Sequence, residues 1–464
     1  MTTTDLIDNE RASAADPAKQ VSTVVAELHS RGIRYAMVSF VDAHGKSKSK
    51  VVPVDHLPDA VGGSELFTGA ALDGVPQEVS DEEVAAVPDI SRYFVLPTRP
   101  DMAWFPSTLH YKGSVFEACS RGILQRTMAA AAELGYTFNL GVETEFFVLR
   151  RTSDGDLVPL SDADDLAKPC YDSRGLLRNF DFIDELVSAM NDAGFEVYSF
   201  DHEDGNGQFE TDFGYADAVT TADRLTYFRL MLTEMAHQHG GIATFMPKPF
   251  DHQTGSGGHM NMSLADADGK NLFATDSDRR GLGLSELGYQ FIAGVLRHAP
   301  AICAVVAPTV NSYKRLIRRT NNSGFTWAPI FGCYGGNNRT NMLRIPLAGG
   351  RVECRAADSA NNPYLAAALM LAAGLEGIRD AADPGAPNME NMYLLSEEEL
   401  AARGISHLPV SLEAALDAFD ADPLTLEVFG ADMHASFLEL KRAEVDAYNA
   451  HVSQWEIDRY LEFF

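Results

Sequence analysis

The chain has 464 residues, of which 66 are acidic and 37 are basic, so its formal charge is -29. This excess of carboxylates argues against a nucleic acid or an anionic membrane as partner, because both select surfaces rich in Lys and Arg. An apolar content of 45% is ordinary for a globular protein, and the length allows about three domain-sized units.

Cysteine usage and the chain ends indicate the compartment. Five cysteines are scattered without a CxxC pair, as in proteins with reduced thiols. The segment 1–20 is polar and lacks the apolar core of a signal peptide, and residues 1–16 are expected to form a disordered tail. The longest apolar run, near 364–375, is too short to span a bilayer. We therefore expect a soluble, cytoplasmic protein.

The segment 17–110 predicts a small, β-rich α+β unit. A helix is expected over 21–29, followed by a hairpin with strands Tyr35–Val41 and Lys46–Val54. Two short strands are expected at 93–97 and 103–105. The pattern becomes helical over 116–134, so a domain boundary is placed near residue 110.

The segment 111–464 mixes long helices with strands that carry polar side chains. Periodicity predicts helices at 177–193, 221–239, 285–299, 363–379 and 430–449. No tandem repeat occurs at a fixed period. Helices and strands do not alternate regularly, which argues against a doubly wound parallel sheet.

The strand 141–149 holds the first chemical signal of this second segment. Glu143 and Glu145 share one face of the strand, whereas Val142, Thr144 and Phe146 face the other way. Adjacent carboxylates repel each other, and a buried carboxylate needs a cation. An isolated pair of this kind is more often simply exposed to solvent.

Three further segments place polar side chains beside a Gly-rich bend or on one strand face. They are Glu203 with Glu210; His259 with Asn261 and Ser263; and Arg351 with Glu353 and Arg355. Each has an ordinary explanation alone, such as a core histidine or a surface ladder of ion pairs. Together with Glu143 and Glu145, they supply five glutamates and one histidine, which suit Mg²⁺ or Mn²⁺ better than zinc.

Clustered arginines accompany these carboxylates, and guanidinium groups bind phosphate and carboxylate in a bidentate manner. Two metal ions with arginine clamps are what phosphoryl transfer from ATP requires. Neither a Walker A sequence nor the kinase set of motifs is present, so a nucleotide would bind on an unrelated fold.

In their order, these motifs resemble the glutamine synthetase family, most closely its type III branch with the γ-glutamylmethylamide synthetases. The resemblance runs from about residue 20 to the C-terminus and is carried by 142–147, 202–210, 245–249, 255–259, 311–316, 338–339, 344–346 and 361–364. It implies an α+β fold with an N-terminal β-grasp domain over 17–110. A catalytic domain on a curved antiparallel sheet with flanking helices would follow over 111–464. Active sites would lie at subunit junctions of a ring, usually in a dodecamer of two hexamers.

The resemblance also implies residue roles at a site with two to three Mg²⁺ or Mn²⁺ ions. Glu145, Glu203 and Glu210 would hold one ion, and Glu143, His259 and Glu353 another. Glutamate would bind to Arg315, Arg355, His259 and the backbone at Gly255. ATP would bind to Arg339, Arg344, Arg351, Asn261 and Ser263, although the family commonly has a histidine at position 261. Arg339, Glu203 and Arg315 would be catalytic.

The implied reaction phosphorylates the γ-carboxylate of L-glutamate with ATP, after which an amine displaces the phosphate. In the family's ammonium pocket an Asp stands where this chain has Thr68, and a flap Glu stands where it has Asn321. Tyr171 and Glu203 still match that pocket. An ammonium ion needs anionic partners and a base, so an organic amine such as methylamine is expected instead. The amine pocket would be lined by Phe67, Phe325 and Trp327, or these aromatic rings would only pack in the protein core.

Three alternatives stay open at this point: a glutamine synthetase that uses ammonia, a non-catalytic structural or regulatory homologue, and a kinase of guanidino compounds. All six candidate metal ligands are present, which argues against the second. The match at 311–316 argues against the third. Tyr393 lies where some bacterial relatives are adenylylated, but an exposed loop tyrosine is the favoured interpretation.

Overall fold

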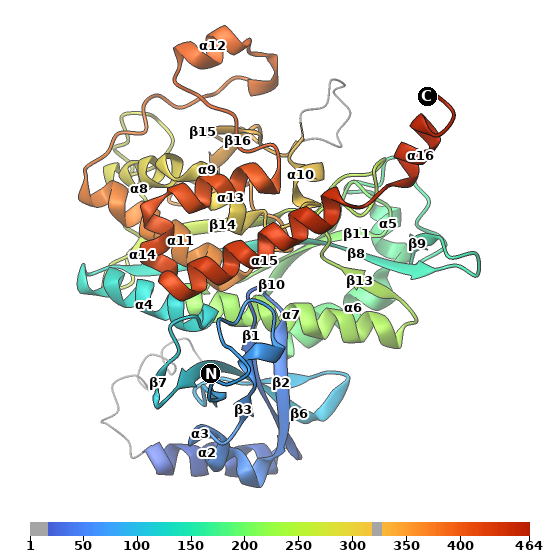
Figure 1. The fold of residues 1–464 in the computed structure, drawn as a ribbon, viewed down its shortest axis with the longest axis vertical. Helices are drawn as coiled ribbons and strands as arrows, with labels where there is room; N and C mark the ends of the chain where they lie inside the picture. Colours follow the sequence, from blue (N-terminus) through green and yellow to red (C-terminus); the bar gives the residue numbers. More distant parts are fainter. Residues whose placement is uncertain (1–16, 318–326) are drawn as a thin grey trace.

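The computed structural model describes residues 17–317 and 327–464. The expected tail 1–16, together with Asn321 and Phe325, lies outside the described residues. Two sheets organise the described part of the chain, and helices cover them (Figure 1). The expected α+β class is confirmed.

The N-terminal sheet has seven strands in the order β2-β1-β6-β4-β3, with β5 and β7 also paired to β6. The hairpin prediction is confirmed, because β1 pairs with β2 in antiparallel register from Tyr35 opposite Pro53 to Val41 opposite Ser47. β6 runs parallel to β1. The bounds are β1 Tyr35–Val41, β2 Ser47–Pro53, β3 Leu66–Phe67, β4 Val84–Pro88, β5 Phe94–Leu96, β6 Arg99–Tyr111 and β7 Ser114–Val115.

The prediction of a short strand at 103–105 is wrong, because β6 spans 13 residues. Its length follows from its central place, since β1, β4, β5 and β7 all pair with it. Helix α2 (Pro17–Ser30) replaces the shorter helix expected at 21–29, and α3 (Leu57–Val61) follows a 3-10 turn. In Figure 1 this N-terminal unit lies below the rest of the molecule.

The second sheet has ten strands in the order β10-β11-β8-β14-β17-β16-β15, with β9, β12 and β13 paired to β8. All of its pairs are antiparallel except β15 with β16. The bounds are β8 Thr137–Arg151, β9 Leu157–Pro159, β10 Val197–His202, β11 Gln208–Phe213, β12 Ala216–Asp217, β13 Ile242–Thr244, β14 Gly258–Ala265, β15 Phe331–Gly336, β16 Asn341–Ile345 and β17 Val352–Cys354.

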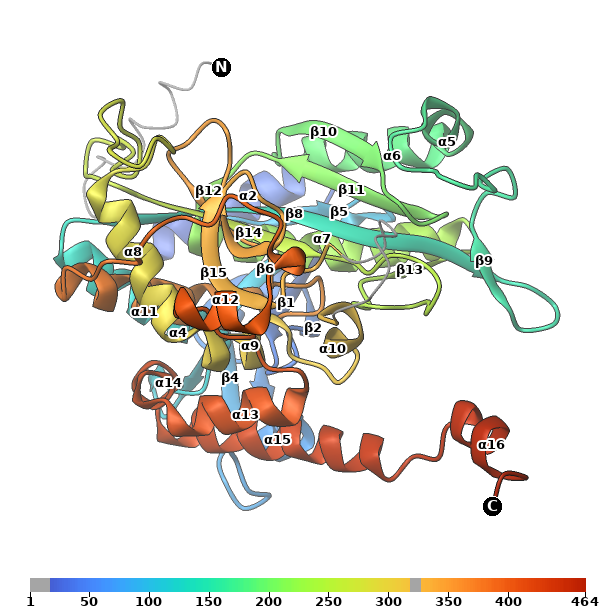
Figure 2. The same ribbon diagram turned by 90° about the horizontal axis from the view of Figure 1, so that it is seen from above.

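Helices flank this second sheet, as Figure 2 shows from above. Four of the predicted long helices are confirmed within a few residues: α7, α8, α11 and α15. The helix bounds are α4 Ser120–Glu133, α5 Ser173–Arg178, α6 Phe180–Asp192, α7 Ala218–Gln238, α8 Glu286–Arg297, α9 Ala299–Val306, α10 Ser312–Arg315, α11 Pro363–Arg379, α12 Glu397–Ala402, α13 Leu412–Ala421, α14 Pro423–Phe429, α15 Ala431–Asn449 and α16 Gln454–Tyr460.

Two helix predictions need correction. The single helix expected at 177–193 is two helices, because Asn179 ends α5 and begins α6. Its side-chain amide donates to the Gly175 carbonyl at 2.8 Å, which caps the first helix. The helix expected at 116–134 begins only at Ser120.

Part of the N-terminal sheet packs into the large hydrophobic core of the second sheet, and the rest of the N-terminal unit has a smaller core of its own. Phe94 of the N-terminal sheet stacks on Tyr227 of α7 with ring centroids 4.7 Å apart, and Trp104 packs on the same ring. Beside them, buried Arg121 donates two hydrogen bonds to Asp223 at 3.0 Å and one to Asp89 at 2.7 Å. These contacts hold the N-terminal unit against helices α4 and α7, which flank the second sheet.

All five cysteines are free thiols, as the sequence predicts. Within the described ranges, no single helix is both long and apolar enough to cross a membrane; the bent pair α8 and α9 passes that test by length and composition only.

Candidate active site

Strand register gathers the predicted ligands on one face of the second sheet. His259 of β14 lies opposite Glu143 of β8, and Glu210 of β11 lies opposite Glu145 of β8. On the far side of β14, Glu353 of β17 lies opposite Asn261. Alternation within each strand sends these side chains to the same face. Residues more than 200 positions apart, such as Glu143 and Glu353, therefore share one site.

Three groups of side chains could each hold a cation, with their ligand atoms within 4.8 Å of one another. The groups are Glu143, His259 and Glu353; Glu145, Glu210 and His259; and Asp201, Glu203 and Glu210. The first is the set that the sequence predicts. The second pairs Glu145 and Glu210 with His259 rather than with Glu203. Glu203 joins Glu210 and Asp201 in the third.

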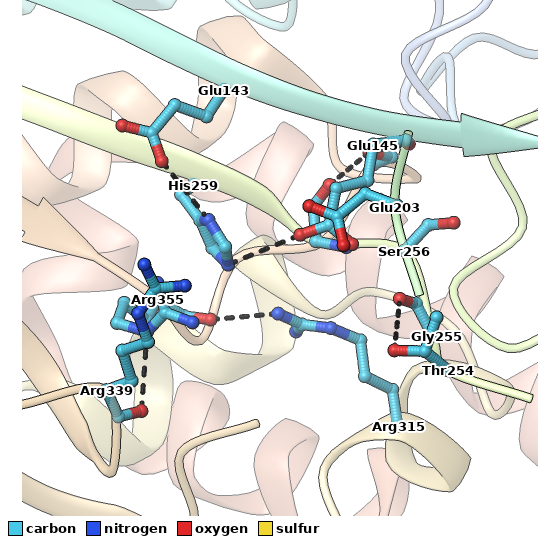
Figure 3. A network of polar contacts seen from close by, with 12 residues as sticks. Glu143, Glu145, Glu203, Thr254, Gly255, Ser256, His259, Arg315, Arg339 and Arg355 are labelled. Atoms are coloured by element: carbon cyan, nitrogen blue, oxygen red, sulfur yellow. Dashed lines mark hydrogen bonds and ion pairs between the residues drawn. The ribbon is translucent and has the colours of Figure 1, made fainter. Parts of the chain in front are cut away.

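The imidazole of His259 belongs to two of these groups and lies between Glu143 and Glu145 (Figure 3). Its Nδ1 is 3.4 Å from Glu143 Oε2 and 3.7 Å from Glu353 Oε1, and its Nε2 is 3.9 Å from Glu145 Oε1. His259 is 5% exposed, and its Nδ1 is buried without a hydrogen-bond partner among the described residues. An unsatisfied buried nitrogen between carboxylates fits a divalent cation, which would accept its lone pair.

The pKa values of the acids at the β10–β11 end of the site, and that of His259, also indicate a cation site. Burial, reinforced by the Glu145 and Asp201 carboxylates, raises the pKa of Glu203 to about 8. Burial and neighbouring acids also raise the pKa of Glu210 well above its usual range and the pKa of Asp212 to about 7. Burial, followed by the charge of Arg355, lowers the pKa of His259 well below its usual value. A bound cation would relieve this repulsion and let the acids ionise.

The β16–β17 end is built differently, because arginines neutralise its acid. Glu353 is fully buried; it accepts from Arg344 Nη1 at 2.6 Å and from Arg355 Nη1 at 2.7 Å. Arg315 donates to the backbone carbonyls of Ala356 and Arg355 at 3.2 and 3.0 Å. These guanidinium groups leave positive charge facing the cavity, which suits an anionic substrate.

Two adjacent cavities open on this face. The first, of about 400 Å³, is lined by acids, by His259, by arginines and by several smaller or aromatic residues. They are Glu143, Glu145, Glu203, Asp204, Glu210, Asp212, His259, Arg315, Arg339, Arg344, Arg355, Gly255, Tyr171, Cys170, Thr254, Trp327 and Ala328. The second, of about 410 Å³, is lined by Asn261, Ser263, Arg351 and the aromatic rings of Tyr198, Phe213 and Tyr215. Glu143 lines both cavities.

Two residues expected near the amine do not lie in either cavity of this chain. Thr68 is in the N-terminal unit, where its hydroxyl donates to Glu83 at 3.3 Å. Phe67 packs edge-on against Phe40 with centroids 4.9 Å apart. Tyr171 and Trp327 do reach the first cavity, and the Trp327 ring lies 5.8 Å from the guanidinium carbon of Arg339.

The sequence reasoning missed Asp201 and Asp212, which extend the acidic end. Asp201 lies opposite Glu210 in the β10–β11 pair, and Asp212 stands two residues beyond Glu210 on the same strand face. The same alternation that places Glu143 and Glu145 on one face is present in this segment and is the signal that identifies Asp201 and Asp212.

The interpretation of Tyr393 as an exposed loop residue is wrong. It lies in a 3-10 turn (Met392–Leu394), is half-buried, and packs against Phe331 with centroids 5.8 Å apart. Its hydroxyl donates to the Ala328 carbonyl, and burial raises its pKa to about 12. The hydrogen bond from the phenol thus stabilises the position of the segment that carries Ala328 at the cavity wall.

A buried imidazole among carboxylates, with arginines beside it on a curved antiparallel sheet, is suited to a metal-dependent enzyme that acts on anionic substrates. Comparison with known proteins makes the assignment specific. The family model for the glutamine synthetase catalytic domain matches residues 117–460. The chain belongs to the glutamine synthetase family.

Individual relatives cover nearly the whole chain. A glutamate–methylamine ligase of Methyloversatilis universalis is 42% identical over 94% of this chain and 98% of its own length. A glutamine synthetase of Rhizobium leguminosarum bv. phaseoli is 41% identical over 95% of this chain and 99% of its own length. A solved structure of GmaS with ADP matches with a TM-score of 0.88 at 40% identity, covering 95% of this chain and 99% of that chain.

Proposed function

We propose that this chain is an ATP-dependent ligase that joins the γ-carboxylate of L-glutamate to an amine through a γ-glutamyl phosphate. The observation that carries the proposal is the cavity itself, in which clustered carboxylates around His259 face Arg315, Arg339, Arg344 and Arg355. Cations and anionic groups must meet in such a site for a phosphoryl group to reach a carboxylate. Relatives named as glutamate–methylamine ligase and glutamine synthetase support it.

For the first cation site we propose Glu143, His259 and Glu353, which form one of the groups described above and would hold one Mg²⁺ or Mn²⁺ ion. For a second ion we keep the set that the family resemblance implies, Glu145, Glu203 and Glu210, of which Glu145 and Glu210 group with His259 and Glu203 and Glu210 group with Asp201. Asp201 beside Glu203 and Glu210 offers room for a third. When bound, such ions supply neutralising charge for the phosphates of ATP.

The arginines would handle the substrates. In the first step a γ-carboxylate oxygen of glutamate attacks the γ-phosphorus of ATP, ADP leaves, and an acyl phosphate forms. Arg315, Arg355 and the Gly255 backbone would hold glutamate, while Arg339 and Arg344 stabilise the transferring phosphate. ADP would remain in the second cavity with Arg351, Asn261 and Ser263.

In the second step the unprotonated amine attacks the acyl carbon, inorganic phosphate leaves with the bonding electrons, and the γ-amide remains. The amine nitrogen must lose a proton, and Glu203 at the cavity wall is our candidate acceptor. Tyr171 would lie beside the incoming amine.

We propose an organic amine, such as methylamine, as the acceptor. Thr68 and Asn321 replace two acids of the family's ammonium pocket, and Cys170, Trp327 and Ala328 give the first cavity an apolar wall. The rival is a glutamine synthetase that uses ammonia, the activity named for several relatives. Mass spectrometry of γ-glutamyl products, with ammonium and a panel of alkyl and aryl amines at equal concentration, tests this. Glutamine as the dominant product would overturn the choice of acceptor.

A T68D variant sharpens that experiment. An added carboxylate favours a small cation, so we expect the ratio of glutamine to alkylamide to rise in T68D while T68S stays like the parent. An unchanged ratio would remove Thr68 from the amine pocket.

We further propose that the enzyme is a ring oligomer, with the dodecamer of two hexamers as the expected form. Thr68 does not reach its own cavity, so it would have to act in a neighbour's. Helix α16 and the chain end project from the body (Figure 2) and expose apolar side chains, including Trp455, Leu461 and Phe464. Apolar surface of this extent favours burial against another copy. Native mass spectrometry of the full chain gives the subunit number.

The division of the chain into a β-grasp domain at 17–110 and a catalytic domain at 111–464 also stays a proposal. It is supported by the end of β6 at Tyr111 and by the family match that begins at residue 117. The free thiols and the proposed substrates support a cytoplasmic location.

A further inference from the structure

The two cavities are separate, yet one ligand residue belongs to both. Glu143 lines the first cavity with His259 and the second with Asn261 and Arg351. If the first cavity holds the cations and the second holds the nucleotide, Glu143 lies between the two ligands.

Asn261 forms hydrogen bonds with Glu143 and with Arg351, and so connects the two cavities. Its side-chain amide donates to Glu143 Oε1 at 2.9 Å, and its side-chain oxygen accepts from Arg351 Nε at 2.9 Å. The first bond crosses from β14 to β8, and the second crosses from β14 to the start of β17. Because donor and acceptor point opposite ways, only one orientation of the amide satisfies both partners.

The bond to Glu143 leaves its other oxygen for a cation. Oε1 is occupied by Asn261, and Oε2 is the oxygen that lies 3.4 Å from His259 Nδ1. Asn261 therefore fixes the rotation of the carboxylate and aims Oε2 at the imidazole. Such outer hydrogen bonds set the orientation of metal ligands.

The bond to Arg351 leaves the end of that guanidinium for a ligand. Nε is held by Asn261, and among the described residues no hydrogen bond or ion pair of the two terminal nitrogens is formed. The guanidinium is planar, so fixing Nε also fixes the direction of the terminal pair. Arg351 lines the second cavity, where these nitrogens can meet a phosphate or ribose oxygen.

We propose that Asn261 is a positioning residue that couples the cation held at Glu143 to the nucleotide held at Arg351. This inference rests on the proposed function. With a cation bound, Glu143 Oε2 would be held in place, and Asn261 would transmit that order to the Arg351 guanidinium, so that the nucleotide would meet an arginine already oriented. By linkage, the nucleotide must strengthen cation binding by the same factor.

The proposal differs from a direct nucleotide contact at Asn261, the role suggested by the sequence. Both polar atoms of the amide already have one protein partner, so a direct contact could use only the second N–H and the second lone pair, in the orientation that these two bonds impose. The two roles predict different results. A contact residue contributes to nucleotide affinity with or without the cation, whereas a coupling residue contributes only when both ligands are present.

The test compares N261A with N271A in the full chain. Asn271 lines the same cavity, but its amide donates to the Gly350 carbonyl at 2.8 Å and, within the described ranges, has no hydrogen bond to a proposed metal ligand. ADP affinity is measured by calorimetry without divalent cations and with saturating Mg²⁺. The Mg²⁺-dependent gain of the parent chain is the reference, so binding of Mg²⁺ by ADP in solution cancels between variants.

We expect N261A to lose about fivefold to tenfold of the Mg²⁺-dependent gain in ADP affinity, with little change when Mg²⁺ is absent. N271A should keep the full gain. N261H, which keeps a donor and an acceptor on one side chain, should restore part of it. Adding N261A to R351A should leave the Mg²⁺-dependent gain in ADP affinity almost unchanged, because R351A already removes the hydrogen bond between Asn261 and Arg351.

Equal losses for N261A with and without Mg²⁺ would overturn the inference, as would full additivity with R351A. Thermal unfolding of each metal-free variant shows whether a loss of affinity reflects misfolding. N261D keeps the acceptor for Arg351 but repels Glu143. As a second variant it must therefore lose the same Mg²⁺-dependent gain in ADP affinity. These results are independent of amide synthesis. A parent chain that makes no γ-glutamyl amide would overturn the proposed function instead.

Discussion

The two ends of the active-site sheet carry carboxylates in opposite circumstances. At the β16–β17 end Glu353 is fully buried between Arg344 and Arg355, at 2.6 and 2.7 Å. At the β10–β11 end the carboxylates of Glu203 and Glu210 face other acids, and burial with this repulsion raises their pKa values. One end supplies its own cations, and the other needs cations from solution. The difference explains how one surface can hold metal ions and anionic substrates side by side.

The same substitution at the two ends tests this contrast most strongly. E353Q should abolish detectable ligase activity and destabilise the metal-free protein by about 3 kcal/mol, because it leaves the buried guanidinium of Arg355 and the partly buried one of Arg344 without their acid. Thermal unfolding in EDTA and product formation measure both effects. E185Q, at an exposed acid that pairs with His239 at 2.8 Å, is the surface control. A metal-free E353Q as stable as the parent would contradict the account.

E210Q should behave in the opposite sense when no metal is present. It removes one member of a repelling group, so we expect the metal-free protein to gain about 1 kcal/mol while divalent-cation affinity falls at least tenfold. The gain should be larger near pH 8 than near pH 5, because the raised pKa keeps the carboxyl protonated at low pH. Thermal unfolding in EDTA at the two pH values measures the change in stability, and calorimetric titration with Mn²⁺ measures the change in cation affinity. Destabilisation by E210Q would contradict the comparison.

The pH dependence of the parent chain follows from the same carboxyls. A carboxyl whose folded pKa is raised contributes stability below its unfolded pKa and loses it as the pH rises through the folded value. Asp212 titrates at about 7 and Glu203 at about 8, so metal-free stability should fall from about pH 4 to pH 8. Cation affinity should rise over the same range, by up to about tenfold per pH unit for each proton displaced. Melting curves with EDTA or Mg²⁺ at each pH check this.

D201N should give the smallest effect. Asp201 belongs only to the group with Glu203 and Glu210, so we expect about a tenfold loss at one cation site and little change at the others. A Mn²⁺ titration followed by electron paramagnetic resonance separates tight from weak sites. Loss of every site in D201N would show that the acidic end is a single unit.

The sequence predicts the elements of this site better than its assembly. Strand alternation alone places Glu143 and Glu145 on one face, and the structure agrees because Val142, Thr144 and Phe146 are buried. That His259 lies opposite Glu143 depends on register between strands more than a hundred residues apart, which local patterns do not encode. The family resemblance supplied that information.

Other features depended on the tertiary context. The length of β6 comes from its four partner strands, and the break between α5 and α6 comes from a single capping side chain, Asn179. Tyr393 is half-buried because Phe331 and Ala328 lie beside it. Periodicity could not reveal these neighbours.

The central claim is that the sheet face holds divalent cations between its acidic and basic ends. Anomalous diffraction from crystals of the full chain grown with Mn²⁺ and ADP tests it directly. The account predicts one peak bounded by Glu143, His259 and Glu353 and another bounded by Glu145, Glu210 and Glu203. Anomalous density elsewhere, with these six side chains free of metal, would contradict it.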